Sequence, residues 1–157
     1  MQPSVYIETT IVSYLVARPS RDAIMAERER QTREWWENRC GEYRLFTSET
    51  TLVEARRGET FMARTRLAAL VGIPLIPERS GIPALAKALR ASGALPINAT
   101  EDAYHMASAA VERIDYLLTW DCRHIANPHI RRRCETVCQE HGAELPILCT
   151  PAELLRR

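Results

Sequence analysis

The chain has almost no lysine and no long apolar run. Both absences bear on which class of protein it can belong to. Lys87 is the only lysine among 21 basic residues, so nearly all of the positive charge is arginine. Arginine suits bidentate phosphate contacts, but a GC-rich genome would give the same bias, and we favour that explanation. No apolar stretch approaches the ~20 residues of a membrane-spanning helix. The N-terminal segment has no basic leader, so we expect a cytoplasmic protein without membrane contact.

Cysteine is also too sparse and too irregular for a disulfide framework. The five cysteines are an odd number in a chain of 157 residues, so we expect reduced thiols. With 46% apolar and 26% charged residues, the composition is that of one globular domain spanning residues 1–157. A net charge of +1 neither favours nor excludes a nucleic-acid partner.

Short apolar segments alternate with segments of helical periodicity. This order predicts an α/β fold with a mostly parallel central sheet of about five strands and helices on both faces. The expected strands are 4–8, 43–47, 73–76, 114–120 and 145–149, and the proline-interrupted 73–76 belongs near an edge. The expected helices are 22–39, 48–57, 59–70, 80–90, 98–113, 127–141 and a short one after Thr150. Start signals precede four of them: Ser48, Asn98 with Glu101, Asn127 with Pro128, and Thr150 with Glu153.

Four acidic residues occupy the ends of these elements. Glu8 closes the first strand, Asp121 follows strand 114–120, Asp102 lies in the first turn of its helix, and Glu54 lies about one and a half turns into another. Ligands of open α/β sheets bind beyond the carboxyl ends of the strands, so we expect the four side chains to converge there. Clustered carboxylates repel one another unless a cation compensates them, and Mg²⁺ or Mn²⁺ prefers such oxygen ligands. A site of this kind suits hydrolysis of a phosphodiester.

Two of the acids also have a simpler explanation when each is taken alone. Asp102 could merely complement the helix dipole, and Glu54 could form a solvated pair with Arg57, three residues later. Glu8 is the hardest to explain as a surface residue, because it directly follows an apolar strand. The joint pattern is therefore stronger evidence for a metal site than any one member.

Three segments carry a resemblance to a known family. VYIETTIVSYL (5–15) resembles the opening of PIN domains, ATEDAYHMASAA (99–110) is similar to their third acidic motif, and LLTWDCRHIAN (117–127) resembles the motif around their fourth acid. Glu54 falls where the family has its second acid. The resemblance covers essentially the whole chain, and its length and order look most like the VapC-type toxins of bacterial toxin–antitoxin pairs.

The resemblance implies a metal-dependent endoribonuclease. Its catalytic and metal-binding residues would be Glu8, Glu54, Asp102 and Asp121, holding one or two Mg²⁺ or Mn²⁺ ions. Residues that would orient carboxylates or contact phosphate are Thr10, Thr119, Arg123 and His124. The family usually has Asp at the first acidic position, so Glu8 moves that carboxylate outward by one methylene and leaves the metal preference open.

The expected partners are a single-stranded or looped RNA substrate, a cognate antitoxin and a second copy of the chain in a homodimer. An alternative is a PIN-fold module that binds RNA or protein without cutting, with Glu8 as the first sign of decay. Retention of all four acids favours the enzyme. A flap-processing nuclease acting on DNA is a third possibility, which the short chain disfavours.

Three other features have both a functional and a simpler interpretation. His124, Cys134, Cys138 and His141 could bind zinc, but the CxxC spacing of structural zinc motifs is missing and we favour buried free cysteines. The run 131–133 is three arginines, which could follow an RNA backbone or form a solvated helix face. Trp35 and Trp36 cannot both face the core, so one lies at an interface or is partly exposed.

Overall fold

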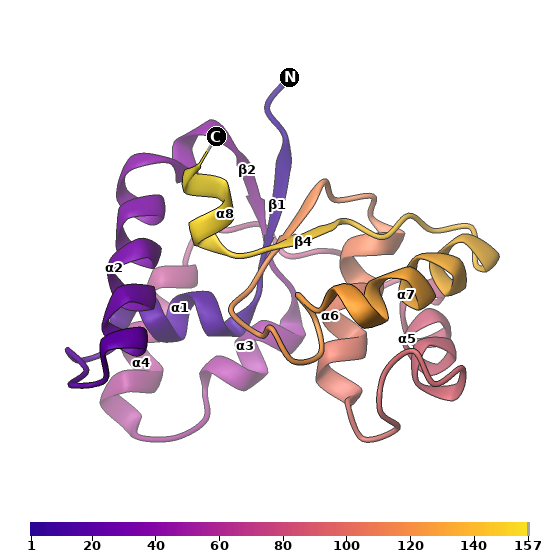
Figure 1. The fold of residues 1–157 in the computed structure, drawn as a ribbon, viewed down its shortest axis with the longest axis horizontal. Helices are drawn as coiled ribbons and strands as arrows, with labels where there is room; N and C mark the ends of the chain where they lie inside the picture. The colour runs from indigo at the N-terminus through magenta and orange to yellow at the C-terminus, as the bar shows by residue number, and fades with distance from the viewer. Residues whose placement is uncertain (157) are drawn as a thin grey trace.

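The computed structural model describes residues 1–156, and its core is a four-stranded, wholly parallel sheet (Figure 1). The strands are β1 (Ser4–Ile7), β2 (Arg44–Phe46), β3 (Tyr116–Leu118) and β4 (Ile147–Cys149), in the spatial order β2-β1-β3-β4. In register, Tyr6 pairs with Phe46 on one side and with Leu117 on the other. The parallel α/β architecture is confirmed, but the expected number of strands was wrong.

The missing strand is the segment 73–76. It forms a single bridge, between Leu75 and Thr47, beside the edge strand β2. Pro74 and Pro77 flank Leu75 and Ile76, and a proline has no N–H to donate to a sheet ladder. The segment lies next to an edge, as predicted, yet it does not extend into a strand.

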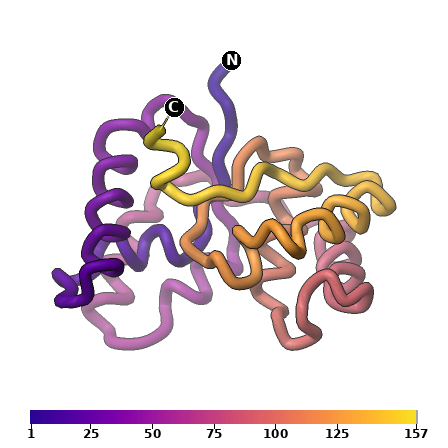
Figure 2. Tube along the Cα trace, viewed as in Figure 1, coloured from indigo at the N-terminus to yellow at the C-terminus, as the bar shows by residue number. Residues whose placement is uncertain are grey.

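Eight α-helices surround the sheet within residues 1–156. They are α1 (Thr9–Val16), α2 (Ala23–Asn38), α3 (Glu49–Ala55), α4 (Thr60–Leu70), α5 (Gly81–Ala91), α6 (Thr100–Val111), α7 (Pro128–Glu140) and α8 (Pro151–Leu155). Two apolar clusters lie on opposite faces of the sheet, because neighbouring strand residues point to opposite sides. Tyr6 packs with α5, α6 and α7, whereas Val5 and Ile7 pack with α1, α2 and α8. Figure 2 shows β1 running between these two layers.

Some helix starts follow the sequence signals and others do not. Asn127 caps α7 by accepting from the His129 N–H, with Pro128 following it, and Thr150 forms the expected capping box with Glu153. The predicted start at Asn98 was wrong, because the N-cap of α6 is Ala99 and carries no side-chain cap. The expected helices did not include α1. The cap of α1 is Glu8, which accepts from the Thr10 N–H and is not a favoured cap residue.

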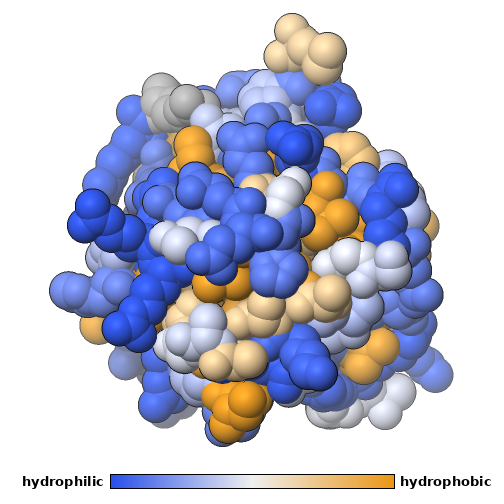
Figure 3. All heavy atoms as spheres, turned by 90° about the vertical axis from the view of Figure 1, so that its right-hand side faces the viewer, coloured by the Kyte–Doolittle hydropathy of each residue, from blue (hydrophilic) through white to orange (hydrophobic). Residues whose placement is uncertain are grey.

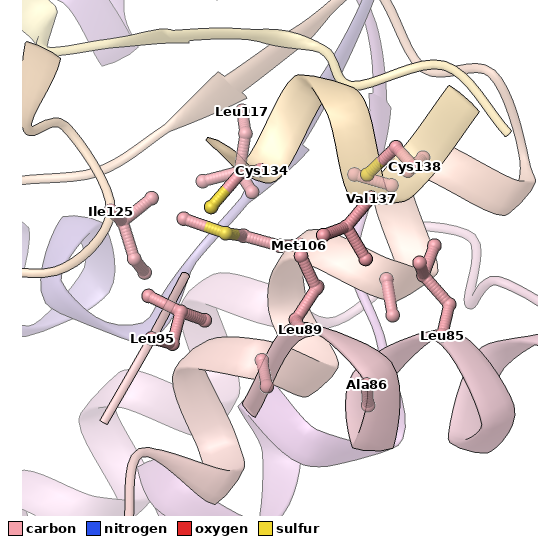
Figure 4. Packing of buried hydrophobic residues seen from close by; sticks show 14 of the residues in the cluster. Leu85, Ala86, Leu89, Leu95, Met106, Leu117, Ile125, Cys134, Val137 and Cys138 are labelled. Carbon is pink, nitrogen blue, oxygen red and sulfur yellow. The ribbon is translucent and has the colours of Figure 1, made fainter. Parts of the chain in front are cut away.

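The zinc alternative is contradicted by the packing of the cysteines. Cys134 and Cys138 are buried in the core against Met106 and Val137 (Figure 4). Within residues 1–156, neither candidate metal-ligand group contains a cysteine. His141 instead bonds the carbonyl of Val137 on its own helix. Burial raises the pKa of the Cys138 thiol to about 12, which favours the uncharged thiol over a thiolate ligand.

The remaining sequence features have ordinary surroundings. Arg131 pairs with Glu135, while Arg132 and Arg133 are exposed. In Figure 3, hydrophilic side chains cover most of the face that includes α5 and α7, and apolar ones form small separate patches. Trp35 is fully buried and Trp36 is partly exposed. In the described part of the chain, no helix has both the length and the apolar character needed to cross a membrane.

Candidate metal centre

The four predicted acids lie beyond the carboxyl ends of the strands. Within residues 1–156 they belong to two separate groups. In each group, the potential ligand atoms lie within 4.8 Å of one another. One group is Glu8, Glu54 and His105, and the other is Asp102, Asp121 and His124. Both groups contain a residue of α6, because His105 follows Asp102 by one helical turn. The four acids and His124 were expected from the sequence, whereas His105 was not.

Glu8 is oriented through one of its two carboxylate oxygens. Only 3% of the residue is exposed, and its Oε1 accepts from the Thr10 N–H (3.0 Å), the Thr10 hydroxyl (2.5 Å) and the Thr119 hydroxyl (2.8 Å). Its Oε2 accepts no hydrogen bond from residues 1–156. Burial raises the pKa of Glu8, against the opposing effects of His105 and the three hydrogen bonds. Because Oε2 accepts no hydrogen bond from residues 1–156, it remains available to a cation.

Thr119 connects Glu8 with the other group of acids. Its hydroxyl donates to Glu8 and accepts from the backbone N–H of Asp121 at 2.9 Å. The hydroxyl of Thr10 makes a parallel link, accepting from the N–H of Trp120 at 2.8 Å. Both threonines thus fix the end of β1 against the turn that follows β3. Both hydroxyls contact Glu8, and the predicted role of Thr10 and Thr119 in orienting metal-binding carboxylates stays a prediction.

Glu54 is held by a buried histidine. Its Oε1 lies 2.5 Å from Nε2 of His105 and accepts from the Thr9 hydroxyl at 2.7 Å. The Nδ1 of His105 lies 2.6 Å from the hydroxyl of Tyr6, which in turn lies 2.5 Å from the hydroxyl of Ser48. Burial alone would raise the pKa of Glu54, but the hydrogen bond and charge of His105 lower it to about 2. Because both ring nitrogens are engaged, His105 orients a carboxylate and is not free to bind a metal.

His105 could have been found from its spacing. It lies three residues after Asp102, on the same face of α6, and a histidine at that spacing from an acid is a common pattern for metal sites. Its ring is fully buried, and burial by itself disfavours the imidazolium. Tyr6, Glu54 and Glu8 outweigh that effect and raise the pKa of His105. These three neighbours therefore favour the imidazolium, whereas burial opposes it.

The second group combines Asp102, Asp121 and His124. The Nδ1 of His124 lies 2.7 Å from Oδ2 of Asp102, and both side chains are partly buried. The Oδ1 of Asp121 accepts from the N–H groups of Arg123 (3.0 Å) and His124 (3.1 Å), which fixes the turn after β3. Burial raises the pKa of Asp102, and the neighbouring Asp121 adds to that effect while His124 opposes it.

The phosphate-binding role of Arg123 stays a prediction, whereas Arg57 does not form the pair with Glu54 that was considered. Arg123 is exposed, and its contact with Asp121 is made by its backbone N–H. Arg57 does not pair with Glu54 but with Glu101, through two hydrogen bonds of 3.0 and 2.5 Å. Glu54 turns inward toward His105, which leaves Arg57 to the acid of the neighbouring helix.

The donor set fits a hard divalent cation. Carboxylates of four residues face one end of the sheet, and the buried Glu8 presents an oxygen without a hydrogen-bond donor among residues 1–156. Oxygen-rich sites of this kind suit Mg²⁺ and Mn²⁺. Comparison with protein family models, with curated proteins and with solved structures finds no match to this chain.

Proposed function

We propose that the protein is a metal-dependent endoribonuclease with a PIN-like fold, which cleaves phosphodiester bonds of single-stranded or looped RNA in the cytoplasm. The observation that carries the proposal is the position of Glu8. It is buried at the end of β1, two threonine hydroxyls orient one oxygen, and the other oxygen lacks a protein donor within residues 1–156. This second oxygen is not one of the completely enclosed polar atoms of residues 1–156, so it is open to a cation that enters from solvent.

The proposed ligands are Glu8, Glu54, Asp102 and Asp121. A bound Mg²⁺ or Mn²⁺ would lower the pKa of a water molecule and polarise the scissile phosphate. Thr10 and Thr119 hold Glu8 in place, and His105 holds Glu54. His124 keeps Asp102 in position through a 2.7 Å contact, and its Nε2 remains available to a phosphate oxygen.

The decisive experiment is cleavage of a mixed RNA pool by the purified protein with Mg²⁺ or Mn²⁺, compared with EDTA. We expect fragments with either ion, none with EDTA, and none from Asp121→Asn, which removes one ligand charge. Glu144→Gln is the matched control, because Glu144 is an exposed acid that pairs weakly with Arg113. Cleavage that persists in Asp121→Asn, or that EDTA does not abolish, would overturn the metal assignment.

The proposed biological role is the toxin of a type II toxin–antitoxin pair, acting as a homodimer. It rests on the resemblance of segments 5–15, 99–110 and 117–127 to VapC-type toxins. Expression of the chain alone should arrest growth, and a small neighbouring open reading frame should relieve the arrest. Normal growth in cells that contain the folded protein would contradict the toxin role but not the nuclease chemistry.

A second candidate is a PIN-fold module that binds RNA or protein without cleaving it. Glu8 favours it, because the longer side chain stands where the family usually has Asp and its pKa is raised by burial. Tight RNA binding without cleavage in either metal would support this candidate. Restoration of cleavage by Glu8→Asp would show that the longer side chain causes the loss.

A further inference from the structure

A pocket of about 440 Å³ opens between α3, α6 and the segment that leads into α5. Its volume falls within the ~300–1,000 Å³ of small-molecule sites. Ile76, Ile82 and Pro83 form apolar walls, and Tyr104 adds an aromatic ring. None of the four acids of the metal centre lines this pocket. It is therefore a neighbouring site with a different chemical character.

The wall of the pocket contains a buried hydroxyl that the fold does not use. Ser108 is only 3% exposed, and its hydroxyl makes no hydrogen bond within residues 1–156. Within residues 1–156, the completely enclosed side-chain atoms without a hydrogen-bond partner are Trp35 Nε1 and Arg90 Nε. The Ser108 hydroxyl is not one of them, so it retains access to the pocket. A buried serine hydroxyl normally has a hydrogen-bond partner, and here that place is open to a water molecule or a ligand in the pocket.

The charges on the pocket wall argue against a phosphate as that ligand. Arg79, the one basic residue of the lining, forms an ion pair with Glu112. Glu49 pairs with Arg56, and Glu78 is an additional exposed acid. The lining thus has no uncompensated positive charge. A flat, uncharged group with polar edges fits it better than an anion does.

The pocket is close to the metal centre through a chain of hydrogen bonds. Ser48, on its wall, contacts the hydroxyl of Tyr6, which contacts His105, which contacts Glu54. On α6, Tyr104 precedes His105 directly and follows Asp102 by two residues. Tyr6 and His105 are fully buried, so this chain connects the two sites through the core. Because residues two apart on a helix point to different sides, the pocket and the acids lie on different sides of α6, around which a flexible RNA strand can pass.

We propose that this pocket binds one nucleobase of the RNA strand that the metal centre cleaves and that it contributes to base preference. This inference rests on the proposed nuclease function and names its substrate-recognition site. Tyr104 contributes the aromatic surface on which a base stacks, as in single-strand recognition. Ser108 supplies one hydrogen bond to a polar edge of the base, which an apolar edge could not accept or donate.

The test measures base preference on a randomised single-stranded RNA, together with kcat/KM for the preferred RNA and for versions substituted at one position. Ser108→Ala should reduce discrimination about 2- to 10-fold, the effect of one hydrogen bond. Tyr104→Ala should reduce kcat/KM for the preferred RNA about 5- to 100-fold, the effect of one base stack. Ser108→Ala removes a hydroxyl that bonds nothing within residues 1–156, so its melting temperature should not fall.

Matched controls separate the pocket from general damage. Ser13→Ala deletes a helix hydroxyl that bonds the Thr9 carbonyl, and Phe61→Ala deletes an exposed aromatic ring of α4 that lies outside the pocket. Neither should change base preference. In a second measurement, made in EDTA, nucleosides should shift the NMR amide signals of Ser108 and Tyr104, whereas inorganic phosphate should not.

The two proposals fail in different ways. Cleavage abolished by Asp121→Asn, with base preference unchanged in both pocket variants, would overturn the base site and leave the nuclease standing. Shifts of the pocket amides by nucleosides, in a protein that cuts no RNA, would support the base site without the nuclease. Absence of both cleavage and nucleoside shifts would overturn both.

Discussion

The imidazole of His105 lies 2.5 Å from the carboxylate of Glu54, and no part of the histidine is exposed. The same ring contacts the Tyr6 hydroxyl at 2.6 Å, so it joins α3, α6 and β1. A buried pair of this kind is stable only while both partners are present, because a lone buried charge is costly.

We predict that His105→Ala lowers the free energy of unfolding by about 3–5 kcal/mol, because it leaves Glu54 and Tyr6 without their partner. Urea denaturation in EDTA measures the effect. His129→Gln is the control, since His129 is exposed on α7 and its loss should change stability little. Equal stability of the two variants would contradict a structural role for the buried pair.

Glu54 should make the stability of the metal-free protein depend on pH. Its pKa is about 2 in the folded chain against an ordinary value of 4.5, so the unfolded chain binds more protons between these values. Its contribution is therefore present above pH 4.5 and is lost as the pH falls toward 2. In Glu54→Gln, the free energy of unfolding should fall less steeply over this range. An unchanged slope, as expected of the exposed control Glu144→Gln, would contradict the lowered pKa.

Glu8 should have the opposite effect on stability. Burial raises its pKa above 4.5, so the folded chain holds the proton more tightly and stability declines as the pH rises through that raised value. Glu8→Gln should therefore stabilise the metal-free protein at pH 7 while it abolishes cleavage. Added Mn²⁺ should raise the melting temperature of the wild type but not that of Glu8→Gln, and thermal denaturation measures both. A Mn²⁺ effect of equal size in Glu8→Gln would exclude Glu8 as a ligand.

Thr119→Val should affect activity more than folding. The substitution keeps the β-branched shape, but it removes the hydroxyl that donates to Glu8 and accepts from the Asp121 N–H. Loss of a group that orients metal ligands typically costs 10–100-fold in metal affinity or activity, and we expect a decrease of about this size. Cleavage rates over a Mn²⁺ titration measure it. Thr136→Val is the control, because that exposed threonine bonds only a carbonyl of its own helix.

The local pattern of the sequence was sufficient to predict the parallel α/β fold. The alternation of apolar and helical segments can be recognised from residues that are close together in the sequence. The same is true of helix caps such as Asn127 and Thr150. The start of α1 escaped this reasoning because Glu8 is an unusual cap residue and is followed by β-branched residues that also suit a strand. The segment around Leu75 looked like a strand, but two prolines limited it to one bridge.

The sequence by itself determined which acids gather at the end of the sheet, because a parallel fold brings the carboxyl ends of its strands to one side. Only the tertiary structure decided how they are paired. Glu54 meets His105, 51 residues later, and His105 meets Tyr6, 99 residues earlier. The partner of Arg57 and the pocket beside Ser108 were decided in the same way. Such contacts depend on how helices pack across the sheet, and the periodicity of a single segment contains no information about the residues packed against it.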